Sequence, residues 1–208
     1  MTETWRCFVA VPLPAELRAR LQGAVETWRA EPMAPDLRWT DPAGWHLTLA
    51  FLGWVAVEEL SAVGRAVAEA ASRGMAQSLA TGGLGVFPTP RRARVLWYGV
   101  TYEHGSLRAL AEDVRSRLIP RVPRLAGESP FRAHVTLARA RAERGIDLSA
   151  WLEAHAAPPG AIPVDRLILY RSHLGGRGPA RYEALGFAPL GGAGWIKADV
   201  AAEASVRG

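Results

Sequence analysis

The chain has 208 residues, of which 49% are hydrophobic and 22% are charged, with a net charge of +5 at neutral pH. This composition is typical of a folded globular protein and excludes a disordered or fibrous chain. The positive charge is compatible with an anionic partner such as nucleic acid, but charge alone does not identify one.

The hydrophobic pattern predicts short strands and helices from the start of the chain. Apolar runs and alternation indicate strands, and apolar residues at three- and four-residue spacing indicate amphipathic helices. In chain order we expect strand 5–11, helix 15–30, strands 37–39 and 46–52, helix 57–73, strands 78–86 and 94–100, helix 106–119, strand 134–140, helix 148–155, and strands 164–170 and 182–187.

The order of these elements indicates the fold class. Several strands follow one another without an intervening helix, which favours mixed or antiparallel sheets over a doubly wound parallel sheet. Gly53 is expected to close the strand over residues 46–52. We therefore predict an α+β protein with one domain over residues 1–190, followed by a frayed Gly/Ala-rich tail over residues 191–208.

The single cysteine and the lack of long apolar runs bear on where the protein works. Cys7 has no partner for an intrachain disulfide, and a lone thiol within a predicted strand is expected to be buried and inert. No run approaches the roughly 18–20 apolar residues that a membrane span needs, and the first residues lack the pattern of a secretion signal. We expect a cytoplasmic protein with no membrane association.

One short motif occurs twice. Residues 46–50 read His-Leu-Thr-Leu-Ala and residues 134–138 read His-Val-Thr-Leu-Ala, so four of five positions are identical. A bare H-x-T pattern is weak, but a repeated match on two predicted strands is much stronger. The repeat indicates a duplicated unit whose two similar halves are related by a pseudo-twofold axis.

Strand geometry limits what the motif can do. Because side chains alternate along a strand, His46 and Thr48 share one face, and the apolar residues up to Phe51 point to the other. The same alternation places His134 and Thr136 on one face of the second strand. If the twofold axis brings the polar faces together, the result is a cleft that contains two imidazoles and two hydroxyls.

Two histidines and two hydroxyls suit the in-line cleavage of a phosphodiester. One imidazole takes the proton of the attacking oxygen, and the other protonates the leaving oxygen on the far side of phosphorus. An unperturbed imidazole pKa near 6.5 keeps both protonation states accessible at neutral pH. The threonine hydroxyls can donate hydrogen bonds to the non-bridging oxygens, where negative charge must be held.

Other interpretations of these residues remain open. Each histidine can be a buried structural residue. A zinc site would need a third ligand, and no H-E-x-x-H pattern or carboxylate pair accompanies either motif. Nucleophilic catalysis has less support, because no G-x-S-x-G pattern is present and Cys7 lies in an apolar strand. We therefore expect neither a metal nor another cofactor.

At these residues the chain resembles the two-histidine (2H) phosphoesterase superfamily. Within it the likeness is to the bacterial and archaeal RNA 2′,3′-cyclic phosphodiesterases, historically called 2′-5′ RNA ligases. The likeness extends over residues 6–14, 39–53, 94–100, 131–139, 169–172 and 182–183. Ala133 and Ala93 depart from the family pattern, which often has proline at both positions.

The resemblance implies a bilobal, duplicated α+β fold, in which two mostly antiparallel sheets form a central cleft with the helices packed outside. It implies metal-independent hydrolysis of terminal 2′,3′-cyclic phosphates on RNA to 2′-phosphates. By the family pattern His46 is the proton donor and His134 is the proton acceptor that activates water. Thr48 and Thr136 then hold the phosphate.

Further residues are candidates for substrate binding. Arg139 stands at the family's usual arginine position, but strict alternation turns it away from His134, so contact with phosphate requires a bulge. Phe51, Trp45 and Trp5 are candidates for stacking on a base.

The remaining basic and histidine residues carry weaker signals. A basic cluster, formed by Arg91, Arg92 and Arg94, is equally consistent with an RNA backbone contact and with a solvated loop. Structural or surface roles are favoured for the three other histidines, which are His104, His155 and His173.

Two other functions remain open at this stage. The same acid and base also serve the reverse reaction, which joins RNA ends, and a non-catalytic RNA-binding module is a third interpretation. The expected partner is RNA with a 2′,3′-cyclic phosphate end. We expect a monomer, because the duplication builds the cleft within one chain.

Overall fold

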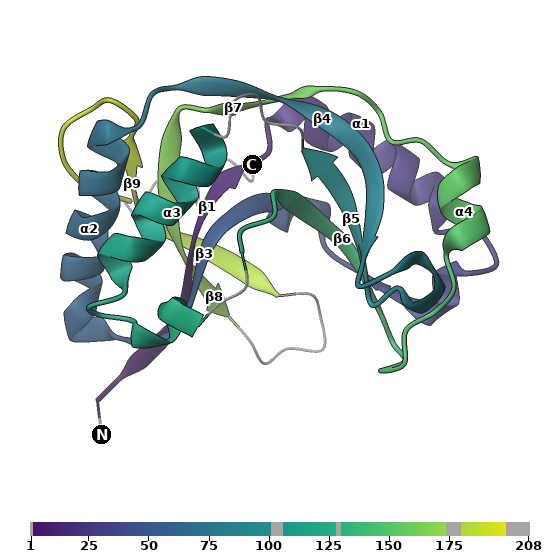
Figure 1. Cartoon of the computed structure of the whole chain (residues 1–208), viewed down its shortest axis with the longest axis horizontal. Coiled ribbons are helices and arrows are strands. Elements are labelled where there is room, and N and C mark those ends of the chain that lie inside the picture. The colour runs from purple at the N-terminus through teal and green to yellow at the C-terminus, as the bar shows by residue number, and fades with distance from the viewer. Residues whose placement is uncertain (1, 101–105, 128–129, 174–179, 199–208) are drawn as a thin grey trace, which may run out of the picture.

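Two five-stranded sheets stand side by side, each with helices on its outer face (Figure 1). The computed structural model describes residues 2–100, 106–127, 130–173 and 180–198. Every strand pairing in this part of the chain is antiparallel. The predicted α+β class and its bilobal arrangement are confirmed.

The observed elements follow the predicted order closely. The strands are β1 (Thr4–Pro12), β2 (Leu37–Trp39), β3 (His46–Ala56), β4 (Gln77–Phe87), β5 (Val95–Val100), β6 (His134–Ala140), β7 (Ala161–Val164), β8 (Arg166–His173), β9 (Arg181–Pro189) and β10 (Ile196–Lys197). The helices are α1 (Ala15–Trp28), α2 (Leu60–Arg73), α3 (Ser106–Leu118) and α4 (Ser149–Ala154).

The two lobes interleave along the chain. The first sheet has the order β10-β9-β8-β1-β3, and the second has the order β2-β6-β5-β4-β7. Helices α2 and α3 cover the first sheet, and α1 and α4 lie on the second (Figure 1). Each sheet therefore contains strands from the first and the second half of the sequence, and the lobes are not the two consecutive halves that the repeat suggested.

Strand β3 runs past the glycine that was expected to end it. Gly53 has a φ of +66°, and the register of β3 against β1 shifts between the pairs Cys7–Gly53 and Phe8–Phe51. Glycine adopts this left-handed conformation without strain, so it absorbs the irregularity and the strand continues to Ala56.

Part of the expected tail belongs to the fold. Strand β10 pairs with β9, and the indole of Trp195 lies so close to Gly64 of α2 that an added Cβ would approach it to 2.8 Å. Residues up to 198 therefore complete the edge of the first sheet, and the fold extends beyond residue 190. Residues 199–208 lie outside the described residues.

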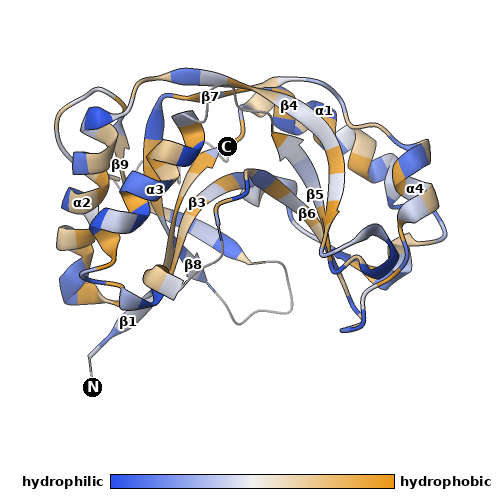
Figure 2. Ribbon diagram, in the orientation of Figure 1, coloured by the Kyte–Doolittle hydropathy of each residue, from blue (hydrophilic) through white to orange (hydrophobic). Residues whose placement is uncertain are grey.

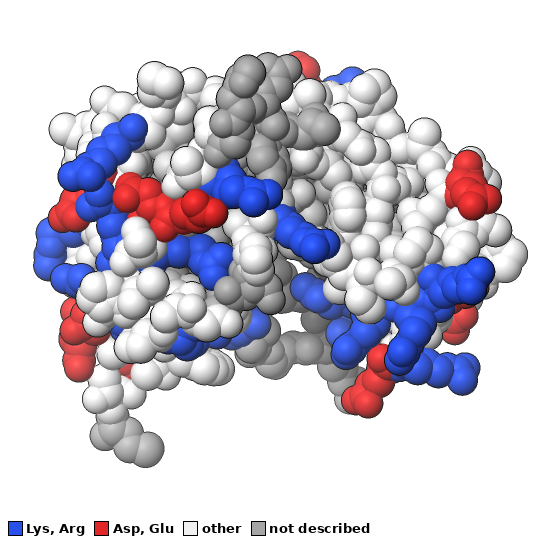
Figure 3. Space-filling view, in the orientation of Figure 1, with Lys and Arg blue, Asp and Glu red and all other residues white. Residues whose placement is uncertain are grey.

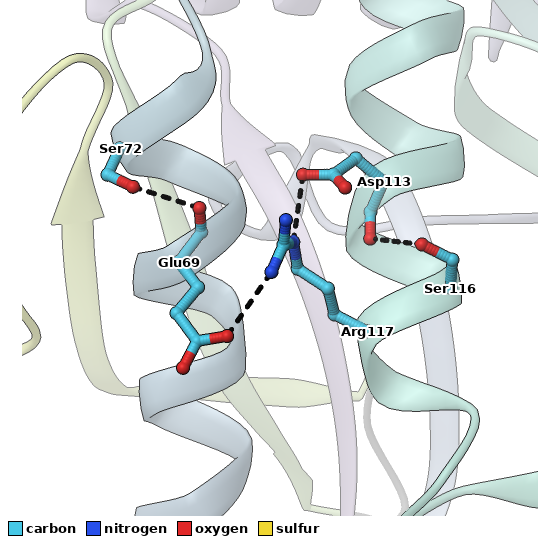
Figure 4. Close-up of polar contacts among 5 residues, drawn as sticks. All are labelled: Glu69, Ser72, Asp113, Ser116 and Arg117. Atoms are coloured by element: carbon cyan, nitrogen blue, oxygen red, sulfur yellow. Dashed lines mark hydrogen bonds and ion pairs between the residues drawn. The ribbon is translucent and has the colours of Figure 1, made fainter.

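Helices α2 and α3 pack side by side over the first sheet. Both carry hydrophobic and hydrophilic residues, as helices that cover a sheet require (Figure 2). Arg117 of α3 lies between Asp113 of its own helix, at 2.9 Å, and Glu69 of α2, at 3.2 Å (Figure 4). Only the contact with Glu69 joins the two helices, and because both ion pairs are near the surface they add little stability.

No helix within the described ranges is both long and apolar enough to cross a membrane.

Trp97 lies flat on the second sheet because its neighbours lack side chains. A Cβ added at Gly85 would lie 2.2 Å from the Trp97 indole, and one added at Gly99 would lie 3.1 Å from it. The same indole lies 6.5 Å from the His134 ring, between ring centroids. The two glycines therefore set the position of an aromatic ring beside the second motif.

We predict that Gly85→Ala lowers the free energy of unfolding by about 1–3 kcal/mol, because the indole must move to admit the methyl group. Gly23→Ala is the matched control, since no atom lies within 4 Å of its added Cβ. In helix α1 that change is expected to raise stability by roughly 0.5–1 kcal/mol. Urea unfolding measures both, and equal stability of the two variants would contradict the packing described.

Candidate active site

A cleft of about 720 Å³ lies where the two sheets meet. Strand β3 of the first sheet and strand β6 of the second lie against each other at this place. His46 and Thr48 of β3 and His134 and Thr136 of β6 all line the cleft. The structure thus brings together the four residues that the repeated motif singled out.

The two histidines are anchored in the same way. The Nδ1 atom of His46 lies 2.6 Å from the carbonyl oxygen of Gly44, and Nδ1 of His134 lies 2.7 Å from that of Arg132. In both cases the acceptor belongs to the residue two positions before the histidine. A carbonyl only accepts hydrogen bonds, so we infer that Nδ1 carries the proton and that Nε2 is the reactive nitrogen.

Aromatic rings enclose both imidazoles. Phe8 stacks on His46 with 4.5 Å between ring centroids, and Tyr182 meets the His46 ring edge-on at 5.1 Å. Phe87 meets His134 edge-on at 5.0 Å. These rings fix the imidazole planes and withdraw them partly from water.

This enclosure makes both histidines weaker bases. Burial lowers the pKa of His46 to about 4; the hydrogen bond to Gly44 opposes this shift, and the charge of His134 adds to it. Burial also lowers the pKa of His134, against the hydrogen bond to Arg132 and together with the charge of Arg139. Both imidazoles are therefore neutral at pH 7 in the free protein.

The two threonine hydroxyls are available to a ligand. Neither Thr48 nor Thr136 makes a side-chain hydrogen bond to another residue of the described part of the chain, and both line the cleft. A hydroxyl in this position can donate to an anionic oxygen at hydrogen-bond distance.

Matched irregularities follow the two motifs. The register of β3 shifts between the pairs Val9–Ala50 and Ala10–Thr48, and that of β6 shifts between Leu96–Ala138 and Trp97–Thr136. In each case one extra residue sits directly after the motif threonine. The next side chains after each bulge therefore lie on the opposite face of the strand from the one that strict alternation predicts.

The bulges correct two expectations from strict alternation. Arg139 follows the bulge of β6 and lines the cleft beside His134, as a role in phosphate binding requires. Phe51, expected on the face opposite His46, follows the bulge of β3 and lines the same cleft. A shift of one residue moves every later side chain to the other face of a strand.

Positive charge surrounds the two histidines. Arg6, Arg38 and Arg139 line the cleft, and none of them forms an ion pair with a carboxylate of the described residues. Partial burial and the charges of Arg38 and Arg6 lower the pKa of Arg139, against the effect of Tyr182. A guanidinium remains charged at neutral pH, so the cleft attracts an anion.

The three aromatic residues expected to stack on a base differ from one another in exposure and in the groups that contact their rings. The guanidinium groups of Arg6 and Arg124 lie 4.4 and 4.8 Å from the Phe51 ring centroid, so this ring already has cationic partners. Trp45 is 3% exposed and offers little ring surface to a base. Trp5 does not line the cleft and lies under Arg171.

Trp45 instead takes part in a bridge between the motifs. Its indole N–H donates to the hydroxyl of Thr40 at 2.8 Å. That hydroxyl lies 2.9 Å from the carbonyl oxygen of Thr136 and 2.8 Å from that of Leu137, and the Thr40 amide also donates to Leu137. The residue next to His46 is thus connected to the bulge beside Thr136.

Cys7, His155 and His173 do not line the cleft. Cys7 is fully buried, as expected, and burial raises its pKa to about 12, so the thiol is protonated at neutral pH. His155 contacts Glu31 at 2.8 Å and His173 contacts Glu183 at 2.7 Å. His104 lies outside the described residues.

The described residues contain no group of three or more His, Cys, Asp or Glu side chains placed to hold a metal ion.

Sequence reasoning missed several residues that line the cleft. They are Arg6, Phe8, Arg38, Trp39 and Tyr182. Alternation along β1 places Arg6 and Phe8 on one face, and this signal becomes useful once the pairing of β1 with β3 is known. Tyr182 reaches the cleft from β9, which no pattern near the motifs indicates.

The chain is similar to known phosphoesterases. Residues 11–97 match the model of the family described as LigT like Phosphoesterase. The RNA 2′,3′-cyclic phosphodiesterase of Thermus thermophilus is 35% identical over 191 residues, which cover 84% of this chain and 85% of that protein. The one of Geobacillus stearothermophilus is 30% identical over 189 residues, but these span only 57% of its own length.

Solved structures give the same result. The crystal structure of Escherichia coli LigT complexed with 3′-AMP is 29% identical, with a TM-score of 0.68, and the match covers 90% of this chain and 99% of that one. Sequence similarity and fold agree over nearly the whole length of that structure. The chain therefore belongs to the LigT-like phosphoesterase family.

Proposed function

We propose that the protein hydrolyses the terminal 2′,3′-cyclic phosphate of RNA to a 2′-phosphate, without a metal ion, through His46 and His134. The observation that carries this proposal is the matched anchoring of two imidazoles in one cleft, with Nε2 as the free nitrogen of each. The names of the relatives, and the 3′-AMP bound by one of them, support a nucleotide substrate.

The proposed reaction needs one base and one acid. Nε2 of His134 takes a proton from a water molecule as its oxygen attacks phosphorus. The bond from phosphorus to O3′ breaks, and the Nε2–H of protonated His46 gives its proton to O3′. The products are a 3′-hydroxyl and a 2′-phosphate. Thr48 and Thr136 donate hydrogen bonds to the non-bridging oxygens, and Arg139 adds positive charge.

Substrate binding supplies the protonation state that the acid requires. His46 is neutral in the free protein at pH 7, because burial lowers its pKa to about 4. A phosphodiester anion beside the ring favours the imidazolium and raises that pKa. We infer that His46 takes up its proton together with the substrate. We also propose a cytoplasmic, monomeric enzyme; one chain supplies both halves of the cleft, which supports the monomer.

His46→Gln and His134→Gln are each expected to lower kcat by about 10²–10⁴-fold, because each removes one proton-transfer group. His155→Gln is the matched control, since this partly buried histidine follows α4 and does not line the cleft, and the kcat of this variant is expected to be unchanged. Chromatography of cyclic-phosphate-terminated RNA in EDTA gives the rate and identifies the product.

Three results would contradict the proposal. They are full turnover by either variant, a rate that EDTA removes and a divalent cation restores, and bound RNA that is never converted. The last result would instead favour the RNA-binding module.

The pH dependence is expected to be bell-shaped with an acidic optimum. Turnover requires one neutral and one protonated imidazole. The value of kcat/KM therefore falls below the lower and above the higher of the two pKa values of the free enzyme. Both values are lowered by burial, so the maximum of kcat/KM is expected below pH 6.5. Because bound phosphate raises them, the maximum of kcat is expected at higher pH. A kcat/KM maximum above pH 7 would contradict this.

Thr40→Val tests the bridge between the motifs, because valine has the same shape but no hydroxyl. Losing the bridge is expected to lower kcat by about 10–100-fold through small displacements of His46 and Thr136, with little change in KM. Thr40→Ser restores the hydroxyl and is expected to restore kcat. Equal loss in both variants would show that only the packing of Thr40 matters.

A further inference from the structure

A second concavity of about 540 Å³ lies directly beside the cleft. Arg38 and Arg139 line both spaces, so the two are adjacent and share a wall. Phe87 forms part of the wall of the second space, and its ring edge contacts His134. We call this space the arginine groove. It leads out of the cleft across the second sheet.

The two shared arginines face each other without compensation. Arg38 of β2 and Arg139 of β6 are register partners on neighbouring strands. Like charges directly opposite each other in an antiparallel pair destabilise the sheet. Neither forms an ion pair with a carboxylate of the described residues. A bound polyanion would relieve this repulsion.

Two more arginines extend the charge away from the cleft. Arg94 precedes β5 and Arg141 follows β6, and both line the groove. The Nε–H of Arg141 donates to the carbonyl oxygen of Pro35 at 3.0 Å, which holds its side chain in place. Glu143 is the one acidic residue of the groove wall. Figure 3 shows basic side chains gathered on the lobe that contains the second sheet.

The chemistry of the proposed substrate indicates where the rest of the RNA strand must lie. A 2′,3′-cyclic phosphate uses both hydroxyls at the 3′ end of RNA, so the strand continues only from the 5′ oxygen of its last nucleotide. With the cyclic phosphate between the two histidines, the preceding nucleotides must leave the cleft along one path. The arginine groove offers phosphate-binding guanidinium groups on such a path.

We propose that the arginine groove binds the phosphate backbone of the nucleotides that precede the cyclic end, and so selects RNA strands over cyclic mononucleotides. This inference rests on the proposed function, since it takes the cleft as the place of the RNA terminus. Arg139 stays with the cyclic phosphate, Arg38 binds the next phosphate of the backbone, and Arg94 and Arg141 bind phosphates further along.

The test measures binding separately from turnover. The probe is a fluorescent ten-nucleotide RNA that ends in a 2′-phosphate, the product of the proposed reaction, and its Kd is measured by anisotropy at several salt concentrations. Arg94→Gln combined with Arg141→Gln is expected to raise Kd by about 10–100-fold. The salt dependence of log Kd is expected to be less steep by about 1.4, for two lost contacts to single-stranded RNA.

The matched control removes the same charge outside the groove. Arg91 and Arg92 are exposed on the adjacent 3-10 helix and do not line the groove. Arg91→Gln combined with Arg92→Gln is expected to leave Kd within about twofold of the unmodified protein. Equal weakening by both double variants would show that general charge attracts RNA, and would overturn the proposal.

Turnover separates the failure of this inference from that of the proposed function. The groove variant is expected to raise KM for a cyclic-phosphate RNA but to match the control variant on a 2′,3′-cyclic mononucleotide, which cannot reach the groove. An equal effect on both substrates would overturn the groove assignment. If unmodified protein binds RNA through the groove but converts neither substrate, the proposed reaction is wrong and the groove stands as an RNA-binding site.

Discussion

The cleft depends on two β-bulges that occur at the same place in two strands. A regular strand would carry one polar face and would turn the residue after the motif into the apolar layer. One extra residue after Thr48 and one after Thr136 reverse that direction. Backbone carbonyls at these irregular places have side-chain partners: Thr40 contacts those of Thr136 and Leu137 at the bulge of β6, and Arg124 donates to those of Phe51 and Leu52 at the further register shift of β3 beside Gly53. The distortions are therefore supported features of the fold.

Anchoring through Nδ1 leaves the same nitrogen, Nε2, free in both copies of the motif. Each motif holds its imidazole by a carbonyl only two residues away, so the tautomer does not depend on the arrangement of the other lobe. The lobes then need to control only the distance between the two Nε2 atoms. The Thr40 bridge joins Trp45 to the second motif, and we expect it to help hold that distance. The carbonyl two residues away determines which ring nitrogen carries the proton, and contacts between distant residues determine where the ring lies.

The sequence predicts the features of the site that depend on neighbouring residues, and it misses those that depend on how distant strands pair. Strand periodicity places His46 and Thr48 on one face, because alternation is a local property of the backbone. Arg139 could not be placed, because a bulge depends on how β6 pairs with its neighbours. Arg6 escaped notice because it lies on β1, whose pairing with β3 and β8 the sequence does not show, and Tyr182 because it lies on β9, which joins this sheet through β8. The interleaving of the lobes was hidden for the same reason, since the spacing of two motifs carries no information on strand order.

The symmetry of the cleft is broken where acid and base must differ. The rings of Phe8, Tyr170 and Tyr182 lie around His46, whereas Phe87 and Trp97 flank His134. A more enclosed imidazole is a weaker base in the free protein, but it also responds more strongly to a bound anion, because the local dielectric constant is lower. In the proposed mechanism His46 uses this response to take up its proton together with the substrate, while His134, which fewer rings enclose, accepts the proton of the attacking water.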